Sequence, residues 1–121
     1  MIDPTRIPER IEAPAAIALE RHTLTQASNG ELVAHTGNAY AYLALNGYDA
    51  GEIALAQAPA SGDVLYLLAA AGQTLERDAP LASNGDGTVR LGDPATDPVL
   101  AYAAEAVAGT TAGQRITANW R

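Results

Sequence analysis

Residues 83–91 read Ser-Asn-Gly-Asp-Gly-Thr-Val-Arg-Leu, and this stretch decides the fold class. Asn and Gly adopt positive φ more readily than other residues, so 83–87 predicts the tip of a tight hairpin. The β-branched and apolar residues of 88–91 predict a strand that leaves this tip. A turn that leads directly into a strand is typical of all-β domains.

Turn and strand signals alternate along the rest of the chain in the same way. Turns are predicted at Ser-Asn-Gly 28–30, Thr-Gly-Asn 36–38, Asn-Gly 46–47 and Pro-Ala-Ser-Gly-Asp 59–63. Strands are predicted at 21–25, 31–35, 39–45, 52–56, 64–68 and 115–120. This spacing predicts a mainly β fold, a small β-barrel or β-sandwich-like domain with at most one short helix.

Alanine-rich segments leave the position of that helix open. Alanine has the highest helix propensity, and it is concentrated at 13–19, 54–60 and 100–108. Segment 99–107 stays open between a strand and a short helix, because alanine dominates the window and hides any periodicity.

The first fourteen residues differ from the rest. Three prolines recur there, and each favours extended geometry at the residue before it. We therefore divide the chain into an extended N-terminal arm, 1–14, and a β-rich domain, 15–121. Ile2, Ile7 and Ile11 are apolar residues on a segment that cannot bury them against itself, which indicates a docking element. A frayed terminus is the alternative.

Charge excludes several partners. The 121 residues carry seven arginines, no lysine and 14 acidic residues, for a net charge of −7. Binding to nucleic acid or to an anionic membrane needs clustered positive charge, so we expect neither partner. The apolar stretches are far shorter than the ~20 residues of a membrane-spanning helix. The N-terminus lacks the basic and apolar regions of a signal peptide, so none is expected.

Catalytic and metal-binding patterns are incomplete. The chain has no cysteine and two histidines, His22 and His35, which leaves little for a transition-metal site. A calcium loop aligned on Gly87 would place Ala82 at its first position, where an oxygen ligand is required.

The sequence also lacks a clear pattern for a catalytic carboxylate pair or a serine nucleophile. Asp93 and Asp97 each precede a proline, where Asp is an ordinary turn former. The sequence has no Gly-x-Ser-x-Gly nucleophile elbow. We expect no enzyme, no metal and no cofactor.

Aromatic residues offer the remaining candidates. Tyr40 and Tyr42 share one face of a predicted strand, and Trp120 stands beside Arg121 at the C-terminus. Tyrosine, tryptophan and arginine are enriched at protein interfaces, so these four residues are candidates for an oligomer interface. The tyrosine pair is alternatively a stacking platform for a ligand such as a carbohydrate.

Four stretches together resemble the head decoration proteins, or capsid cement proteins, of tailed bacteriophages. They are 42–52 (Tyr-Leu-Ala-Leu-Asn-Gly-Tyr-Asp-Ala-Gly-Glu), 61–66 (Ser-Gly-Asp-Val-Leu-Tyr), the hairpin region 79–90, and 99–106 with its Glu-Ala ending. The resemblance covers about residues 31–119. It implies a protein with a small β-barrel-like fold that is often trimeric. Such a protein is made in the host cytoplasm and lies on the outer capsid surface of the virion. It carries over no catalytic residues and no cofactor.

The resemblance also implies a function and a partner. Such proteins bind the major capsid protein and stabilise the expanded shell by bridging capsomers. On the arm, Arg6 and Arg10 are candidate partners for acidic capsid residues, and Ile2, Ile7 and Ile11 are candidate apolar anchors. An extended segment of this kind can add to an open sheet edge of its partner. The alternative function is a stand-alone or virion-displayed binding module that uses the face of Tyr40 and Tyr42.

Overall fold

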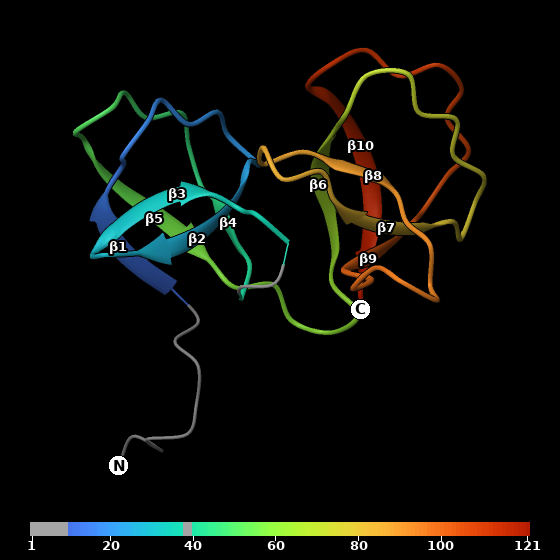
Figure 1. Cartoon of the computed structure of the whole chain (residues 1–121), viewed down its shortest axis with the longest axis horizontal. Coiled ribbons are helices and arrows are strands. Elements are labelled where there is room, and N and C mark those ends of the chain that lie inside the picture. The colour runs from blue at the N-terminus through green and yellow to red at the C-terminus, as the bar shows by residue number, and fades with distance from the viewer. Residues whose placement is uncertain (1–9, 38–39) are drawn as a thin grey trace.

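A computed structural model describes residues 10–37 and 40–121, and every regular element in them is a strand (Figure 1). The all-β prediction is therefore confirmed. No helix in these residues is long and apolar enough to cross a membrane. The strands are β1 Arg10–Pro14, β2 Leu24–Ser28, β3 Glu31–Ala34, β4 Tyr42–Ala44, β5 Ile53–Gln57, β6 Val64–Ala69, β7 Pro80–Ser83, β8 Val89–Leu91, β9 Ala101–Ala103 and β10 Gln114–Trp120.

The strands form two sheets that lie next to each other (Figure 1). The first has the order β1-β5-β4-β2-β3, and the second closes into a small barrel of order β10-β6-β8-β7-β9. The named strands pair antiparallel except for a short parallel contact of β6 with β8, and an isolated bridge between Ala15 and Leu32 is also parallel. The β-rich part of the chain is thus divided between two sheets. All strands of the first sheet come from residues before 58, and all strands of the barrel come from residues after it.

The predicted hairpin turns form as their sequences require. Asn29 and Gly30 both have positive φ, 52° and 80°, and connect β2 to β3. Two central residues in this conformation give the turn a twist that matches the flanking strands. At the tip between β7 and β8, the Asp86 carboxylate accepts a hydrogen bond from the Thr88 backbone N–H at 3.0 Å. This bond closes the loop that the 83–91 sequence predicted.

The barrel interior explains why 99–107 contains a strand. Ala101 and Ala103 are fully buried, while Tyr102 between them is exposed, which is the period of a strand. Small side chains fit the narrow interior, where Leu67 and Ile116 also pack. Burial against the barrel core therefore overrides the helix propensity of alanine.

Strand β1 changes the boundary expected for the arm. Residues 10–14 are extended, as their prolines predict, but they pair with β5 from Arg10↔Gln57 to Pro14↔Ile53. This part of the segment therefore belongs to the first sheet, and Pro14 sits at the strand end, where proline is tolerated. Ile11 packs against the core of that sheet. The remainder of the predicted arm, residues 1–9, lies outside the described residues.

The tip of the β7–β8 hairpin joins the two sheets. Gly87 is buried there, and its carbonyl accepts a hydrogen bond from the Leu24 N–H at 2.9 Å. Nearby, the Ser83 hydroxyl donates to the carbonyl of buried His35 at 3.3 Å. Leu24 and other first-sheet residues pack in the same cluster as the barrel interior, so the sheets share a core: Leu24, Ala41 and Leu43 with Leu67, Leu81 and Val89.

Replacement of Gly87 tests this junction. A Cβ at Gly87 would lie 2.5 Å from the Thr23 Cγ2 and 3.2 Å from the Leu24 carbonyl oxygen, at a φ of +90°. We expect Gly87→Ala to lower the free energy of unfolding by about 2–4 kcal/mol, measured by urea denaturation.

The matched control is Gly85→Ala. Gly85 has a similar φ of +84°, but a Cβ there meets nothing within 4 Å. Only the backbone penalty applies, so we expect a loss of about 1–2 kcal/mol. Equal losses in the two variants would show that the approach of Gly87 to the first sheet is not tight.

Candidate functional site

One side of the barrel exposes large apolar side chains. Val64 and Tyr66 point outward from β6, and Tyr102 points outward from β9, with exposed fractions of 69%, 46% and 40%. Asn119 of β10 lies between them, because it pairs with both Val64 and Tyr102. We call Val64, Tyr66 and Tyr102 the outer strip. Exposed apolar groups gathered on one side of a domain are typical of interaction surfaces.

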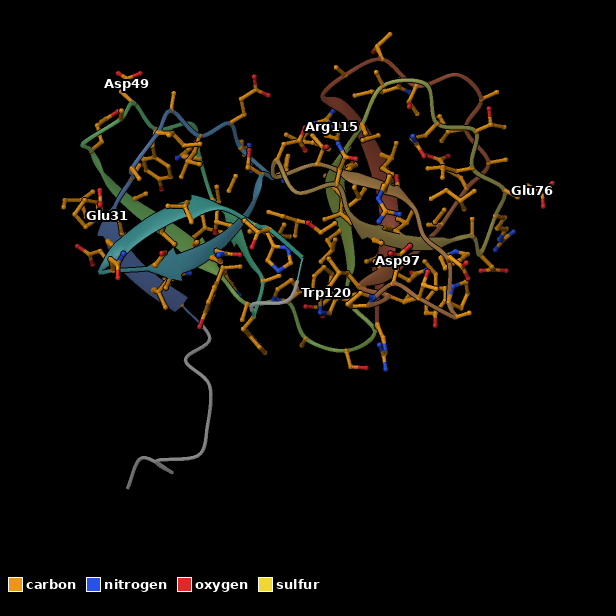
Figure 2. The ribbon with its side chains drawn as sticks, viewed as in Figure 1. Glu31, Asp49, Glu76, Asp97, Arg115 and Trp120 are labelled. Carbon is orange, nitrogen blue, oxygen red and sulfur yellow. The ribbon has the colours of Figure 1, made fainter. Side chains whose placement is uncertain are left out.

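Tyr66 is held in place by two neighbours. The Arg115 guanidinium carbon lies 4.6 Å from the centre of the Tyr66 ring, a cation–π contact, and Figure 2 shows Arg115 on the side of the barrel nearer the first sheet. The His22 ring meets Tyr66 edge-on, with centroids 5.5 Å apart. Burial, followed by the charges of Arg21 and Arg115, lowers the pKa of His22, so its imidazole is neutral at neutral pH.

The predicted capsid-binding residues are only partly described. Arg10 is exposed at the start of β1, whereas Ile11 is half-buried and packs on the first sheet's own core. Arg10 is therefore available to a partner, and Ile11 is largely used by its own domain. Ile2, Arg6 and Ile7 lie outside the described residues.

The two predicted tyrosines lie together but do not form a flat platform. Tyr42 is buried in the core of the first sheet, whereas Tyr40 is half exposed. Their rings meet at 62° with centroids 5.5 Å apart. The Tyr42 side chain points into the core of the first sheet, so little of it is exposed to a second subunit or to a stacking ligand. Of the two tyrosines, Tyr40 is the one whose ring is exposed enough to contact a partner or a ligand.

Trp120 is the last residue of β10 (Figure 2), and Arg121 follows it. Trp120 is half-buried against the barrel core, and its backbone N–H donates to the Asp63 carbonyl at 2.8 Å. The exposed Arg121 donates to the Val99 carbonyl at 3.1 Å. Much of the tryptophan therefore packs within its own domain, and the arginine remains at the surface.

Sequence reasoning missed the outer strip. Segment 64–68 was expected to be a strand, yet apolar residues occupy both of its faces, since Leu65 and Leu67 alternate with Val64 and Tyr66. Alternation alone does not show which set faces the barrel interior. The closure of β6 against β10 decides this, and that contact joins residues far apart in the sequence.

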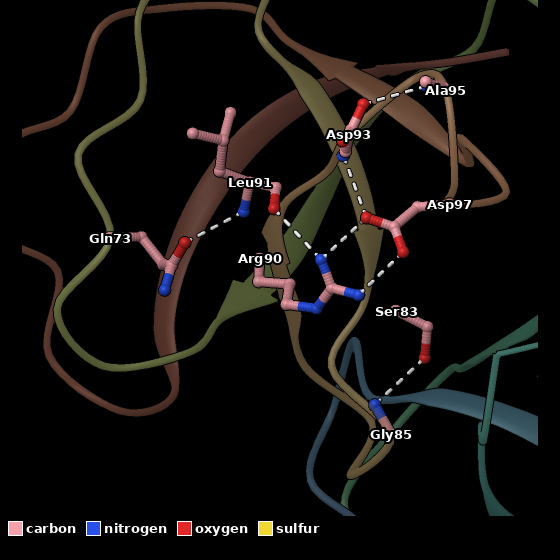
Figure 3. A network of polar contacts seen from close by, with 8 residues as sticks. All are labelled: Gln73, Ser83, Gly85, Arg90, Leu91, Asp93, Ala95 and Asp97. Atoms are coloured by element: carbon pink, nitrogen blue, oxygen red, sulfur yellow. Dashed lines mark hydrogen bonds and ion pairs between the residues drawn. The ribbon is translucent and has the colours of Figure 1, made fainter.

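The loop after β8 is fixed by a network of polar contacts (Figure 3). Arg90 binds both carboxylate oxygens of Asp97, at 3.0 and 3.1 Å, and the Asp93 N–H donates to Asp97 at 2.9 Å. Asp93 in turn accepts from the Ala95 N–H. The Arg90 hydrogen bonds, and then the Asp93 N–H, lower the pKa of Asp97 to about 2. Both carboxylates are therefore engaged in contacts that hold the loop.

The calcium-like loop is likewise occupied by its own contacts. The Asp86 carboxylate accepts hydrogen bonds from Thr88 and from the Asn84 amide. Within 10–37 and 40–121, no three His, Asp or Glu side chains gather in a way that could hold a metal ion. The arrangement around 83–88 builds a turn.

The architecture is that of an all-β fold in which a five-stranded sheet lies beside a small closed barrel. A solved structure with this fold is the N base of the head fiber gp8.5 in bacteriophage phi29, with a TM-score of 0.72 and 21% sequence identity. The alignment covers 93% of this chain and 92% of the other. The likeness establishes the fold, and at that level it agrees with the sequence resemblance to phage head proteins. No protein-family model and no curated protein matches the sequence.

Acid should weaken the Asp97 loop. The pKa of Asp97 is about 2 in the folded chain and near 3.8 without its partners. Its stabilising effect is therefore complete above about pH 5 and is lost as the pH falls toward the folded value. We expect the free energy of unfolding of the wild type to fall more than that of Asp97→Asn between about pH 6 and pH 2, measured by urea denaturation.

Asp49→Asn is the control for this comparison. It removes one carboxylate from the far end of the first sheet, away from Asp97 (Figure 2). This variant should follow the wild type across the same pH range. If Asp97→Asn followed it too, the ion pair would have no stabilising effect.

Proposed function

We propose that this protein is a structural component of a bacteriophage head that binds the outer surface of the capsid. The observation that carries the proposal is the fold shared with the N base of the phi29 head fiber over 93% of the chain. The sequence resemblance to decoration proteins supports the same role. In this proposal the protein is not an enzyme, needs no cofactor and belongs to the virion after synthesis in the host cytoplasm.

The proposed mechanism is thermodynamic. The partner is the major capsid protein, and a protein that binds only the expanded shell stabilises that state by mass action. Contacts with neighbouring capsomers would bridge them, and several linked weak contacts gain from effective concentration. The net charge of −7 favours solubility of a densely decorated particle.

Capsid contact is assigned to the N-terminal segment. Ile2, Arg6 and Ile7 precede Arg10, which is exposed at the start of the edge strand β1. The arginines would pair with acidic capsid residues, and the isoleucines would supply apolar contact. Because β1 ends the sheet order, a segment that continues from it starts at the rim of the domain.

Self-association is assigned to the outer strip. It combines the most exposed large apolar residue among those described, Val64, with two tyrosines on the closed barrel. A homotrimer would bury these side chains and would display three N-terminal segments on one particle. Arg121 and the exposed part of Trp120, at the end of the neighbouring strand β10, would lie at the margin of this contact.

Co-sedimentation tests capsid binding. The full chain should pellet with expanded empty capsids of its own phage and reach a saturating stoichiometry. Removal of residues 1–9 leaves β1 and its pairing with β5 intact, so the truncated chain should unfold as the full chain does. We expect its capsid affinity to fall at least tenfold, about 1.4 kcal/mol. Full occupancy by the truncated chain would contradict the assignment, and no binding by either chain would contradict the function.

Light scattering tests the trimer. Val64→Glu places a charge in the outer strip, where burial of an unpaired carboxylate is costly, so it should convert a trimer to monomers. Ile53→Glu is the matched control, because Ile53 is also an exposed aliphatic residue, at 56%, but lies on β5 of the first sheet. A monomeric wild type, or equal dissociation of both variants, would contradict the proposed interface.

A further inference from the structure

A hollow of about 170 Å³ lies where the first sheet meets the barrel, between β4, β5 and the start of β6. Leu43 and Leu65 contribute apolar surface to it, and Arg21, His22, Gln57 and Asp63 contribute polar groups. Binding sites for small molecules commonly form at such junctions and combine an apolar lining with a few polar groups. The volume is below the roughly 300–1,000 Å³ of drug-sized pockets, so it suits a ligand of one ring.

Two of the polar groups are fixed by backbone contacts. The Asp63 carboxylate accepts from the Ala60 N–H at 2.9 Å, and the Asp63 carbonyl accepts from the Trp120 N–H at 2.8 Å. His22 has a φ of 71°, and its N–H donates to the Ala44 carbonyl at 3.0 Å. A non-glycine residue held in this conformation is uncommon and is concentrated at functional sites. The Asp63 carboxylate is thus oriented before any ligand arrives, and the His22 ring rests edge-on against Tyr66, which lowers the entropy lost on binding.

The other two polar groups are free to bind. Gln26, Gln73 and Gln114 each accept a hydrogen bond from the backbone. Gln57 makes no such bond within the described part of the chain, although it lies at the hollow. The Arg21 side chain likewise has no hydrogen bond or ion pair to the residues of 10–37 and 40–121. Both side chains can therefore turn to a ligand without breaking a contact of the fold.

The chemistry of the hollow indicates the class of ligand. Arg21 donates, Asp63 accepts, and Gln57 and neutral His22 can do both. The opposite charges of Arg21 and Asp63 balance, which favours an uncharged molecule. A pyranose ring has an apolar C–H face and hydroxyl groups that both donate and accept. We propose that the hollow binds one neutral hexose ring, such as the terminal unit of a glycan.

This inference does not depend on attachment to a capsid. The ligand site uses the junction of the two sheets, whereas capsid contact is assigned to the N-terminal segment. It also differs from the stacking face first expected at Tyr40 and Tyr42. Each site can therefore be tested without the other.

A nuclear magnetic resonance titration tests the proposal. The full chain is titrated separately with glucose, galactose, mannose and glucuronate. At least one neutral hexose should shift the methyl signals of Leu43 and Leu65, with a dissociation constant in the millimolar range that is usual for a ligand of this size. Binding of glucuronate alone, shifts confined to another region, or no shift with any sugar would overturn the proposal.

Three variants separate recognition from folding. Gln57→Ala and Arg21→Ala should each weaken binding by about 3- to 10-fold, because each removes a hydrogen-bonding group. His22→Asn keeps a residue that tolerates positive φ and should weaken binding to a similar degree. Each variant should keep the unfolding midpoint of the wild type within a few degrees. An unchanged affinity in all three would overturn the assigned site.

Arg77→Ala is the matched control. Arg77 is exposed and does not line the hollow, so its loss removes the same charge from a different place. The affinity of this variant should equal that of the wild type. An equal loss of affinity in Arg77→Ala and Arg21→Ala would show that net charge, and not the hollow, governs binding.

Discussion

Gly87 has no side chain, and this allows the barrel hairpin to reach the first sheet. Its carbonyl accepts the Leu24 N–H, and its Cα lies where a methyl group would meet Thr23. Each sheet comes from about half of the chain, and domains of about 60 residues bury a smaller share of their surface than larger domains do. The contact brings Leu24 and Leu43 into the barrel cluster and so builds one shared core. The hollow at the junction of the two sheets is a geometrical consequence of that docking.

The turns could be predicted from the sequence, because their conformation depends on a few adjacent residues. Asn29-Gly30 predicts a turn that requires positive φ, and the chain adopts it. The Asn and Gly residues of 83–87 predict a hairpin tip, and in the structure the Asp86 carboxylate closes this turn by accepting from the Thr88 N–H. In 99–107 the alternation was hidden, because Ala101 and Ala103 have the same side chain as their helix-forming neighbours. Only the shape of the barrel interior distinguishes the two structures there.

The pairing of strands that are far apart in the sequence could not be predicted from the sequence. Nothing in the prolines of the first segment shows that residues 10–14 pair with β5, since the partner lies some forty residues away. The division into two sheets and the outward direction of Val64 and Tyr66 depend on closure of β6 against β10. The positive φ of His22 is equally hidden, because the residue type alone does not require it. These are the features on which the candidate surfaces depend.

The proposed function attaches the protein to the outside of a phage head. Cryo-electron microscopy of native virions of the source phage tests this claim most directly. The account predicts density for the two-sheet domain on the outer capsid surface, with residues before Arg10 against the major capsid protein. Particles whose outer surface lacks this density, or that carry the domain inside the shell, would contradict it.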